Sequence, residues 1–329
     1  MKSTLNYDAI LVTGGAGFIG SHTVDALLSL GIRVWVLDDL STGSRHNLKS
    51  WRGHPGLKFK LGSVTDYSTV EAIAKRVDAI IHLAAISSPA ISLKKPELTN
   101  AANVLGTLNL LKAAADNHVQ RFVFASSAAI YGNTNVTKIS EAAPLRPISP
   151  YGVSKLAAEK YCEVYHTIHG LSTVSLRYFN VYGQRQRADN PYSGVIAIFA
   201  RKLMAGRRTT ITGNGLQSRD FVHVSDVVNS NLLALTTEEG VGKSYNIGTG
   251  RATSIKRLHS ILAHLAGTKS KAIFAPARVG DIIRSCASIE NAQRELGYAP
   301  RTELEEGLKQ LVGGRRKVRV PPSRQSEQE

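Results

Sequence analysis

The sequence predicts an α/β protein built on a doubly wound parallel sheet, with a smaller C-terminal lobe. Two observations indicate this fold. Over the first 180 residues, short continuous apolar runs alternate with segments of helical spacing, which is typical of a parallel sheet covered by helices on both faces. A glycine-rich turn follows the first apolar run and opens the first helix, as in sheets of the Rossmann type.

The elements follow in order along the chain. Apolar runs of strand length predict the sheet strands at Ala9–Thr13, Arg33–Leu37, Lys58–Leu61, Ala79–Leu83, Arg121–Ala125, Ser172–Tyr178 and Ser244–Ile247. Helical spacing predicts helices at Gly20–Leu30, Thr69–Arg76, Leu98–Asn117, Tyr151–His169, Gly194–Ala205 and Val224–Leu235. Gly31 and Gly170 are helix-terminating signals, because glycine readily adopts the left-handed conformation that ends a helix.

These elements predict a division of the chain. We expect residues 1–180 to form a Rossmann domain, to which residues 224–250 return. Between residues 183 and 219, glycine, proline, asparagine and arginine become frequent. We therefore expect residues 181–223 and 251–312 to build the smaller lobe. The polar, basic stretch 313–329 reads as a disordered tail.

Composition excludes several classes of protein. Apolar residues make up 43% of the chain, and no apolar run approaches the ~20 residues that a membrane helix needs. The N-terminus has no signal-peptide pattern, so we expect a cytoplasmic protein with no membrane partner. Cys162 and Cys286 lie far apart, without metal-ligand spacing, so we predict neither a disulfide nor a metal site. The net charge of +16 suits anionic ligands, but no nucleic-acid motif accompanies it.

The glycine-rich turn predicts a dinucleotide site. Gly14, Gly17 and Gly20 have the spacing GxxGxxG. Glycine lets the backbone turn sharply and approach a pyrophosphate, while the N-terminus of the next helix offers N–H groups to the phosphates. Asp38 and Asp39 end the second strand, where a carboxylate binds the ribose hydroxyls and repels a 2′-phosphate. The pattern therefore favours NAD over NADP.

A second pattern, YxxxK, predicts a proton-transfer pair. Tyr151 and Lys155 lie one turn apart on one helix face. A free phenol has a pKa of about 10, and a nearby ammonium and the positive nicotinamide ring of oxidised NAD both lower it. Tyr151 can then act as a general base, while Lys155 also hydrogen-bonds the nicotinamide ribose. Ser127 follows the fifth strand, at the edge where ligands of such sheets bind, and we expect it to align the reacting oxygen.

Together these residues resemble the extended short-chain dehydrogenase/reductase family and, within it, the UDP-hexose 4-epimerases. The resemblance runs from about Ile10 to Val312. Its matching stretches are Thr13–His22, Asp38–Gly43, His82–Ala85, Asn103–Thr107, Ser126–Gly132, Tyr151–Lys155, Arg177–Gly183, Arg219–Phe221 and Arg278–Asp281.

The resemblance implies a role for each matching position. The residues implied to bind NAD are Gly14, Gly17, Phe18, Ile19, Gly20, Asp38, Asp39, Leu40, Gly43, Val64, Leu83, Ala84, Ala85, Asn103, Tyr151, Lys155 and Tyr178. Those implied to bind the sugar nucleotide are Ser127, Asn180, Arg219, Arg278, Asp281 and Ser285. Arginine suits a diphosphate because its fork donates two parallel hydrogen bonds. The chain departs from the family pattern at Ser63, where many relatives have an aspartate, and at Asp39, where some have an asparagine.

The reaction follows from what stands beside Ser127. Sugar-nucleotide 4,6-dehydratases resemble this chain but carry an Asp-Glu pair directly after the catalytic hydroxyl residue. Ala128 and Ala129 occupy those positions here, and alanine transfers no protons. The resemblance then implies epimerisation at C4 through a 4-keto intermediate. By the same resemblance, Ser285 stands at the position where a bulky residue in epimerases excludes a 2-N-acetyl group. UDP-GlcNAc and UDP-GalNAc are therefore expected beside UDP-glucose and UDP-galactose.

Other readings stay open at this stage. A UDP-glucuronate epimerase or decarboxylase would share the triad and need a cation for the carboxylate, which Arg185 or Arg187 could supply. A further NAD-dependent sugar-nucleotide enzyme, or a non-catalytic NAD-binding scaffold, would share the fold. A nucleic-acid binder is the weakest reading. The family resemblance also implies a homodimer, formed through the helices predicted at Leu98–Asn117 and Tyr151–His169.

Overall fold

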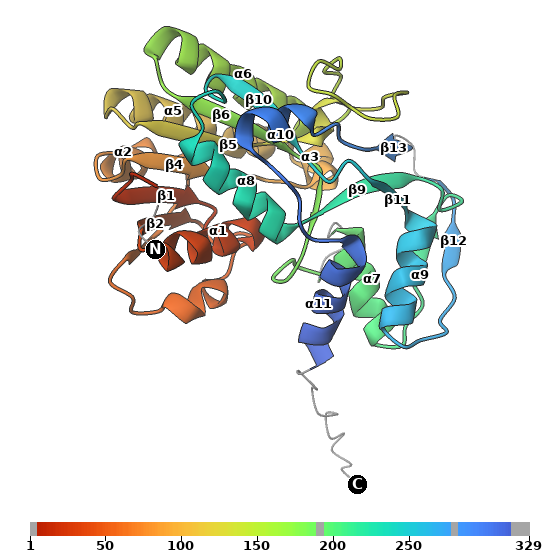
Figure 1. Cartoon of the computed structure of the whole chain (residues 1–329). Coiled ribbons are helices and arrows are strands. Elements are labelled where there is room, and N and C mark those ends of the chain that lie inside the picture. Colours follow the sequence, from red (N-terminus) through yellow and green to blue (C-terminus); the bar gives the residue numbers. More distant parts are fainter. Residues whose placement is uncertain (1–4, 189–193, 278–281, 317–329) are drawn as a thin grey trace.

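The structure is a computed structural model, and it describes residues 5–188, 194–277 and 282–316 (Figure 1). Seven strands form one central sheet in the order β10-β6-β5-β4-β1-β2-β3, and every neighbouring pair is parallel. Their bounds are β1 Ala9–Thr13, β2 Arg33–Asp38, β3 Leu57–Leu61, β4 Ala79–His82, β5 Arg121–Ser127, β6 Thr173–Tyr178 and β10 Lys243–Ile247. The predicted parallel α/β sheet is confirmed, and β10 joins β6 after a long excursion of the chain.

Helices cover both faces of this sheet, as Figure 1 shows. On one face lie α1 (Phe18–Ser29), α8 (Val224–Thr236) and α10 (Glu290–Leu296); on the other lie α2 (Tyr67–Ala74), α5 (Gly106–Asp116) and α6 (Pro150–His169). Because side chains alternate along a strand, the residues of β1 pack into two separate cores, one on each face of the sheet. Val12 packs on the α1/α8 side and Leu11 on the α2/α5 side.

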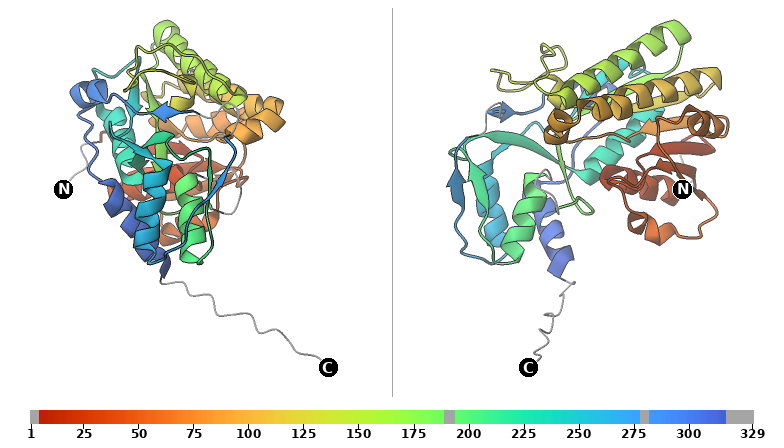
Figure 2. Two further views of the ribbon diagram at one scale, coloured as in Figure 1. Left: turned by 90° about the vertical axis from the view of Figure 1, so that its right-hand side faces the viewer. Right: turned by 180° about the vertical axis from the view of Figure 1, so that it is seen from behind.

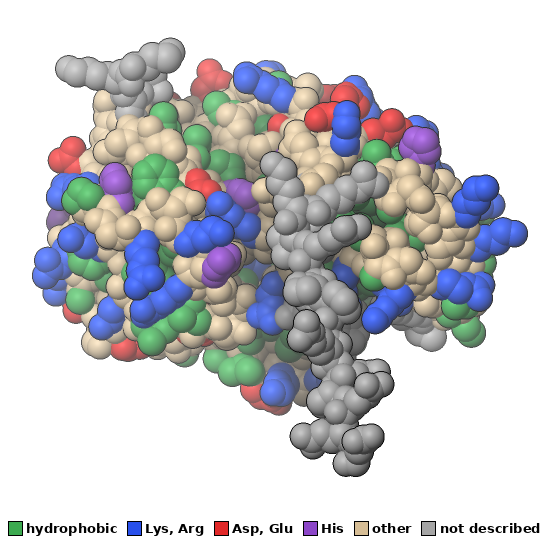
Figure 3. Space-filling view, turned by 90° about the horizontal axis from the view of Figure 1, so that it is seen from below, with side chains coloured by type: hydrophobic (Ala, Val, Ile, Leu, Met, Phe, Trp, Pro, Cys, Tyr) green, Lys and Arg blue, Asp and Glu red, His purple; other side chains and the backbone are tan. Residues whose placement is uncertain are grey.

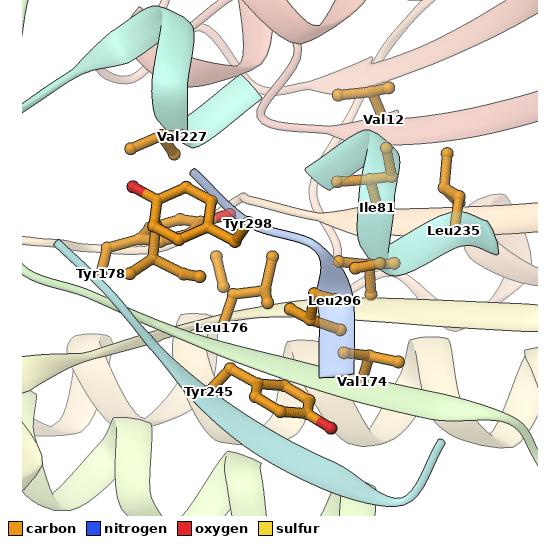
Figure 4. Close-up of a cluster of buried hydrophobic side chains, with 14 of the residues drawn as sticks. Val12, Ile81, Val174, Leu176, Tyr178, Val227, Leu235, Tyr245, Leu296 and Tyr298 are labelled. Atoms are coloured by element: carbon orange, nitrogen blue, oxygen red, sulfur yellow. The ribbon is translucent and has the colours of Figure 1, made fainter. Parts of the chain in front are cut away.

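Figure 4 shows part of the first core, where β1, β4, β6 and β10 meet α8 and α10. Tyr178 and Tyr245 lie in this core beside Tyr298, which follows α10. All three rings are buried. The segment that contains α10 and Tyr298 therefore packs against the sheet, before the chain goes back to the lobe in α11 (Leu304–Arg316).

One predicted helix differs from expectation. The segment predicted as a single helix over Leu98–Asn117 begins at Pro96 and divides into three parts, namely α4 (Pro96–Asn100), a π-helical turn η2 (Ala101–Leu105) and α5. The π-helical turn holds Asn103, whose amide is buried and bonded to other segments. Such turns are often found at functional sites. Apolar spacing alone does not reveal them, since the residues continue to be helical.

The lobe contains its own small core. The elements of the lobe are β7 (Asn180–Tyr182), α7 (Val195–Met204), β8 (Thr210–Thr212), β9 (Ser218–His223), β11 (Ala252–Ser254), α9 (Ile255–Leu265), β12 (Ile273–Ala275), β13 (Arg284–Ser285) and α11 (Leu304–Arg316). Phe199, Leu258 and Leu311 bring α7, α9 and α11 together. Helix α11 runs to Arg316. The sequence predicted disorder from residue 313 onward, and this prediction is wrong for residues 313–316, which continue the helix. Residues 317–329 lie outside the described part.

The remaining elements are short and connect the strands. They are η1 (Arg45–Trp51), α3 (Pro89–Lys94) and η3 (Ala128–Ile130). Within the described ranges, no helix is long and apolar enough to cross a membrane. Basic side chains predominate over acidic ones on the face shown in Figure 3, in keeping with the net charge of +16.

Candidate active site

The strand order of the sheet predicts a ligand site beside the glycine-rich turn. The order reverses between β1 and β4, and ligands of such sheets bind at the carboxyl ends of the strands where it does so. Gly14 has a φ of +66°, and a Cβ there would lie 2.8 Å from the backbone nitrogen of Ala84, just past β4. A Cβ at Gly20 would lie 2.1 Å from the carbonyl oxygen of Gly14. Only glycine allows this close approach of turn, helix and neighbouring loop.

The turn fits a pyrophosphate. Gly17 is the N-cap residue of α1, and it has no side chain to occupy the first N–H groups of the helix, which include those of Phe18 and Ile19. These groups and the positive end of the helix dipole attract an anion. The small cradle and the exposed backbone donors suit NAD as the group held here.

The two acidic residues at the end of β2 have different environments. Asp38 is buried, and its carboxylate accepts hydrogen bonds from the backbone nitrogens of Ala16, at 2.9 Å, and Leu40, at 2.8 Å. Burial raises the pKa of Asp38, and the two backbone bonds oppose that rise. Asp39 is exposed and accepts hydrogen bonds from Ser41. Asp38 therefore fixes the glycine turn to β2, while Asp39 faces outward.

Close packing continues at Gly43. A Cβ there would lie 2.8 Å from a carboxylate oxygen of Asp38. Leu40 adopts a φ of 61°, unusual for a residue with a side chain, and this turns the chain immediately after the acidic pair. Both residues thus shape the backbone beside the glycine-rich turn, where the sequence predicted cofactor contacts.

A buried chain of hydrogen bonds supports the loop after β4. The backbone nitrogens of Leu83 and Ala84 both donate to Thr13 Oγ1, at 3.2 Å, and Thr13 Oγ1 lies 2.7 Å from His82 Nδ1. On the other side of the ring, His82 Nε2 lies 3.0 Å from Thr107 Oγ1. That hydroxyl donates to the Asn103 carbonyl. Thr13 thus donates to Nδ1, and Nε2 carries the proton of a neutral ring.

Burial explains why this histidine stays neutral. Burial is the main cause that lowers the pKa of His82 to about 3, and the charge of Lys155 contributes. The ring joins β1, β4 and α5 without taking a proton at neutral pH. Sequence reasoning did not assign His82 a role, although it begins the matching stretch His82–Ala85.

Asn103 and Val64 support the segments beside the glycine-rich turn from inside the fold. The Asn103 amide accepts from the Ile86 nitrogen, at 2.8 Å, and donates to the Ile86 carbonyl and to Ser154 Oγ, at 2.9 Å. It therefore ties the loop that continues from Ala85 to helix α6. Val64 is buried against Gly106, where a Cβ would lie 2.4 Å from its side chain.

The three predicted catalytic side chains meet at the carboxyl edge of the sheet. Ser127 is the last residue of β5, and Tyr151 and Lys155 lie in the first two turns of α6. The Ser127 and Tyr151 side chains are hydrogen-bonded to each other. Tyr151 is 8% exposed and Lys155 4%. Lys155 Nζ donates to the carbonyl oxygen of Ala125 at 2.7 Å.

The helix start positions the tyrosine. Ser149 is the N-cap residue, and its side chain accepts from the Gly152 nitrogen at 3.1 Å, while Pro150 occupies the first turn. The Tyr151 nitrogen donates to Ser92 Oγ on α3 at 3.0 Å. The first turn of α6 is therefore held from outside the helix as well as from within.

The electrostatics differ in one respect from the sequence prediction. Burial raises the pKa of Tyr151, and the hydrogen bond with Ser127 opposes that rise. Burial lowers the pKa of Lys155 to about 8. The sequence predicted that the ammonium would lower the phenol pKa, whereas the structure gives this effect to Ser127. The physical reason is that the lysine chain extends to the end of β5, where its ammonium binds the Ala125 carbonyl.

Ala128 and Ala129 stand directly beside this group. They begin the short helix η3, and the Ala129 nitrogen donates to Ser127 Oγ at 3.2 Å. The side chains that follow the serine are therefore methyl groups, as the sequence indicated. The site offers proton transfer at Tyr151 without a carboxylate pair at these two positions.

Three residues predicted for the sugar nucleotide share one small sheet of the lobe. Ser285 of β13 is the register partner of Arg219 of β9, and Asn180 of β7 pairs with Phe221 two residues further along β9. Segments separated by about 100 residues thus come together. Arg219 is half-buried and Ser285 buried. Arg278 and Asp281 lie outside the described residues.

Asp220 organises this part of the site, and sequence reasoning missed it. Its buried carboxylate accepts from the Thr249 nitrogen and hydroxyl and from the nitrogens of Gly250, at 2.9 Å, and Ala287, at 3.1 Å. It therefore holds β9, β13 and the turn before β11 together. A carboxylate inside the matching stretch Arg219–Phe221 was the available signal.

Tyr178 has a different environment from the one predicted. The ring lies in the first core, and its hydroxyl donates to Asn231 Oδ1 on α8 at 2.5 Å. Asn231 in turn donates to Thr23 Oγ1 on α1 at 3.2 Å. The side chain thus joins β6 to two helices, so a contact with NAD would have to come from the backbone of Tyr178.

A loop of the lobe reaches across to the dinucleotide half. Arg185 forms an ion pair with Asp25 on α1, with 2.6 Å between Nη2 and Oδ2. The Gln184 carbonyl lies 3.0 Å from His22 Nε2 on the same helix, and Arg187 donates to the Thr42 carbonyl at 3.3 Å. Both arginines considered for a substrate carboxylate therefore contact the elements that hold the cofactor.

Known proteins share both this sequence and this fold. The model of the NAD dependent epimerase/dehydratase family matches residues 10–248. A UDP-glucose 4-epimerase of Mycolicibacterium smegmatis is 38% identical over 304 residues, covering 92% of this chain and 96% of the relative.

Solved structures agree with this match. The UDP-glucose 4-epimerase of Thermotoga maritima, crystallised with UDP-glucose, has a TM-score of 0.90 and 40% identity, covering 94% of this chain and 99% of its own. The UDP-N-acetylglucosamine 4-epimerase of Methanobrevibacter ruminantium, in complex with UDP-N-acetylmuramic acid, has a TM-score of 0.90 and 33% identity, covering 94% and 98%. With the glycine turn, the acidic pair and the Ser-Tyr-Lys cluster in place, this chain belongs to the NAD-dependent epimerase/dehydratase family.

Proposed function

We propose that this enzyme interconverts UDP-hexoses that differ at C4, in an NAD-dependent reaction that passes through a 4-keto sugar. The observation that carries the proposal is the cluster of Ser127, Tyr151 and Lys155 at the carboxyl edge of the sheet, with alanines at 128 and 129. Proton transfer without an acid–base pair for removing water matches epimerisation. The related epimerases support the same reading.

Each residue has a defined part in the proposed mechanism. Tyr151 takes the proton of the sugar O4 and later returns it, and Ser127 donates a hydrogen bond that keeps O4 and the phenol aligned. Lys155, whose ammonium binds the Ala125 carbonyl, would hydrogen-bond the nicotinamide ribose. The glycine-rich turn at Gly14, Gly17 and Gly20 would hold NAD, which would supply a reversible hydride acceptor for C4. The sugar must present its other face between the two transfers, which a diphosphate held firmly in the lobe would permit.

Different parts of the chain would bind the cofactor and the sugar nucleotide. We infer that residues 1–180 with 224–250 form the NAD-binding domain. Residues 181–223 and 251–312 would bind the sugar nucleotide, apart from the α10 segment, which packs on the sheet. Arg219, Asn180 and Ser285 on one small sheet support this assignment, as does the glycine turn in the other half. The small side chain of Ser285 extends the proposal to N-acetylated UDP-hexoses.

Turnover and product identity test the proposal. Incubation with UDP-glucose and with UDP-GlcNAc, followed by NMR of the products, should yield the C4 epimer of at least one of them. Tyr151→Phe should lower turnover by about 10²–10⁴-fold, because it removes the proton acceptor. An unchanged rate in this variant, or no epimer from either substrate, would contradict the proposal.

UDP-glucuronate is the second candidate substrate. Its carboxylate needs a cation, but Arg185 already pairs with Asp25 and Arg187 contacts the Thr42 carbonyl, both on the cofactor side. This arrangement favours an uncharged hexose. Release of carbon dioxide from UDP-glucuronate at a rate above that of hexose epimerisation would reverse the preference.

We infer a homodimer formed by the helix pair α5 and α6 with the adjoining α4. The helices lie side by side, as the right-hand view of Figure 2 shows. Apolar side chains on them remain exposed, with Val153 at 53% and Ile168 at 71%. Exposed apolar stripes of this kind mark interfaces. Ile168→Asp should shift the protein to monomer in light scattering, whereas Phe274→Asp, on a distant strand, should not.

We infer a cytoplasmic location. Both cysteines are free and buried, which agrees with a reducing compartment. Nucleotide sugars and NAD would be available there.

A further inference from the structure

A buried ion pair lies behind the proton-transfer residues, and the proposed mechanism does not use it. Glu159 is one turn beyond Lys155 on α6, and Arg177 lies on β6; both side chains are almost fully buried. Arg177 Nη2 is 2.6 Å from Glu159 Oε1, and Arg177 Nε is 3.1 and 3.2 Å from the two carboxylate oxygens. Arg177 Nη1 donates to the Tyr131 hydroxyl at 2.7 Å, so both ends of the pair are satisfied.

The pair has a third partner at the end of β5. Ser126 Oγ donates to Glu159 Oε2 at 2.5 Å, and Ser126 immediately precedes Ser127. One turn earlier on α6, Lys155 Nζ donates to the carbonyl oxygen of Ala125. Two side chains on the same face of α6, Lys155 and Glu159, therefore hydrogen-bond to the two residues that precede Ser127. Arg177 is the register partner of Ser126 on the adjacent strand, which closes the network.

Stability alone is a poor explanation for this network. Taking two charges out of water costs free energy that their attraction repays only in good geometry, and apolar residues of similar volume often serve as well. A fully satisfied buried network does, however, rigidify the segments that it joins. The segments joined here are the strand that ends in Ser127 and the helix whose first turn holds Tyr151.

We propose that Glu159 and Ser126 are positioning residues that hold Ser127 Oγ against the Tyr151 hydroxyl. Neither touches the reacting atoms, and both act through Ser127. The inference rests on the proposed role of Tyr151 as the base. It predicts that loosening the end of β5 weakens the Ser127–Tyr151 hydrogen bond, and with it the ionisation of the phenol.

Other charged and titratable groups face these residues from the surrounding elements. Lys155 and Cys162 on α6 lie near Glu159, and Tyr131 and Glu141 lie beside Arg177. Around Tyr151 stand Lys155 on the same helix, Ser127 from β5 and Ser92 from α3. Ser126→Ala leaves all of these groups in place and removes one hydroxyl. A change in the Tyr151 pKa would therefore arise from a change in the position of Ser127, because no charge has been removed.

The test uses the full-length holoenzyme with ¹³Cζ-labelled tyrosine. The Tyr151 signal is identified by its loss in Tyr151→Phe, and its pKa is read from an NMR titration. Ser126→Ala should raise that pKa by up to about one unit and lower kcat for UDP-glucose about tenfold, while KM changes less than about twofold. Ser126→Thr keeps the hydroxyl and should restore both values.

Thr173→Val is the matched control. Thr173 and Ser126 are both 2% exposed, and Thr173 Oγ1 also joins a strand to α6, at the Cys162 carbonyl. Thr173→Val should lower the melting temperature about as much as Ser126→Ala, yet leave the Tyr151 pKa and kcat unchanged. An unchanged Tyr151 pKa in Ser126→Ala, or an equal shift in Thr173→Val, would overturn the proposal. The titration needs no turnover, so it decides this point even if the wild type fails to epimerise UDP-glucose.

Discussion

Replacing Lys155 by methionine offers a quantitative test of how the site is built. Lys155 is 4% exposed, and burial lowers its pKa from 10.5 to about 8. Methionine has similar length and no charge. We expect the variant to lose turnover, because the donor proposed for the nicotinamide ribose is gone. We also expect it to lose a pH dependence of stability that the wild type possesses.

The sign follows from proton uptake. Between about pH 8 and pH 10.5 the unfolded chain holds the lysine proton and the folded chain releases it, so the stability of the wild type rises with pH. The difference in pKa is 10.5 minus about 8, or about 2.5, and each unit corresponds to about 1.36 kcal/mol. The buried ammonium therefore costs about 3 kcal/mol at neutral pH, and this cost falls as the pH rises.

The comparison with Lys155→Met isolates this effect. In the variant the Ala125 carbonyl lacks its donor at every pH. The cost of this lost hydrogen bond is therefore constant and does not contribute to the pH dependence of the stability difference. From pH 7 to about pH 10 the wild type should gain about 2.5 kcal/mol of unfolding free energy relative to the variant. For a chain of 329 residues this corresponds to roughly 4 °C in melting temperature.

Urea denaturation of NAD-free wild type and variant at several pH values measures the difference. All other titrating groups are shared, so they cancel. A stability difference that stays constant from pH 7 to about pH 10, or that moves in the opposite direction, would refute the reasoning that the lysine is charged, buried and costly to the fold.

Three further predictions concern the cradle, the lobe and the contact between them. Gly20→Ala should abolish measurable NAD binding in calorimetry, because its Cβ would lie 2.1 Å from the Gly14 carbonyl oxygen; normal affinity would show that the turn can open. Asp220→Asn should raise KM for the UDP-sugar at least about tenfold but leave NAD affinity intact, since an amide NH₂ cannot accept the backbone donors that the carboxylate holds. A double-mutant cycle on Arg185 and Asp25, followed by thermal unfolding, should give a coupling of about 0.5–1 kcal/mol, as expected for a partly exposed pair; zero coupling would mean that the loop is not held there.

The sequence alone determined the fold class and the kind of chemistry. Strand-length apolar runs, glycines at fixed spacing and the acids after β2 are local signals, because each depends on a few neighbouring residues and their backbone preferences. The resemblance to a family then added the reaction. The YxxxK spacing placed Tyr151 and Lys155 on one helix face without any knowledge of what that face meets.

Only the tertiary structure decided which groups these side chains contact. Lys155 binds the Ala125 carbonyl and leaves the phenol to Ser127, and Tyr178 turns into the core. Asp220 ties β9 to the turn before β11 and to the segment after β13. The π-helical turn at Asn103 and the pairing of Ser285 with Arg219 likewise depend on segments distant in sequence. Such contacts form between residues that no spacing rule relates. Burial and the geometry of hydrogen bonds in the packed interior fix which partners meet.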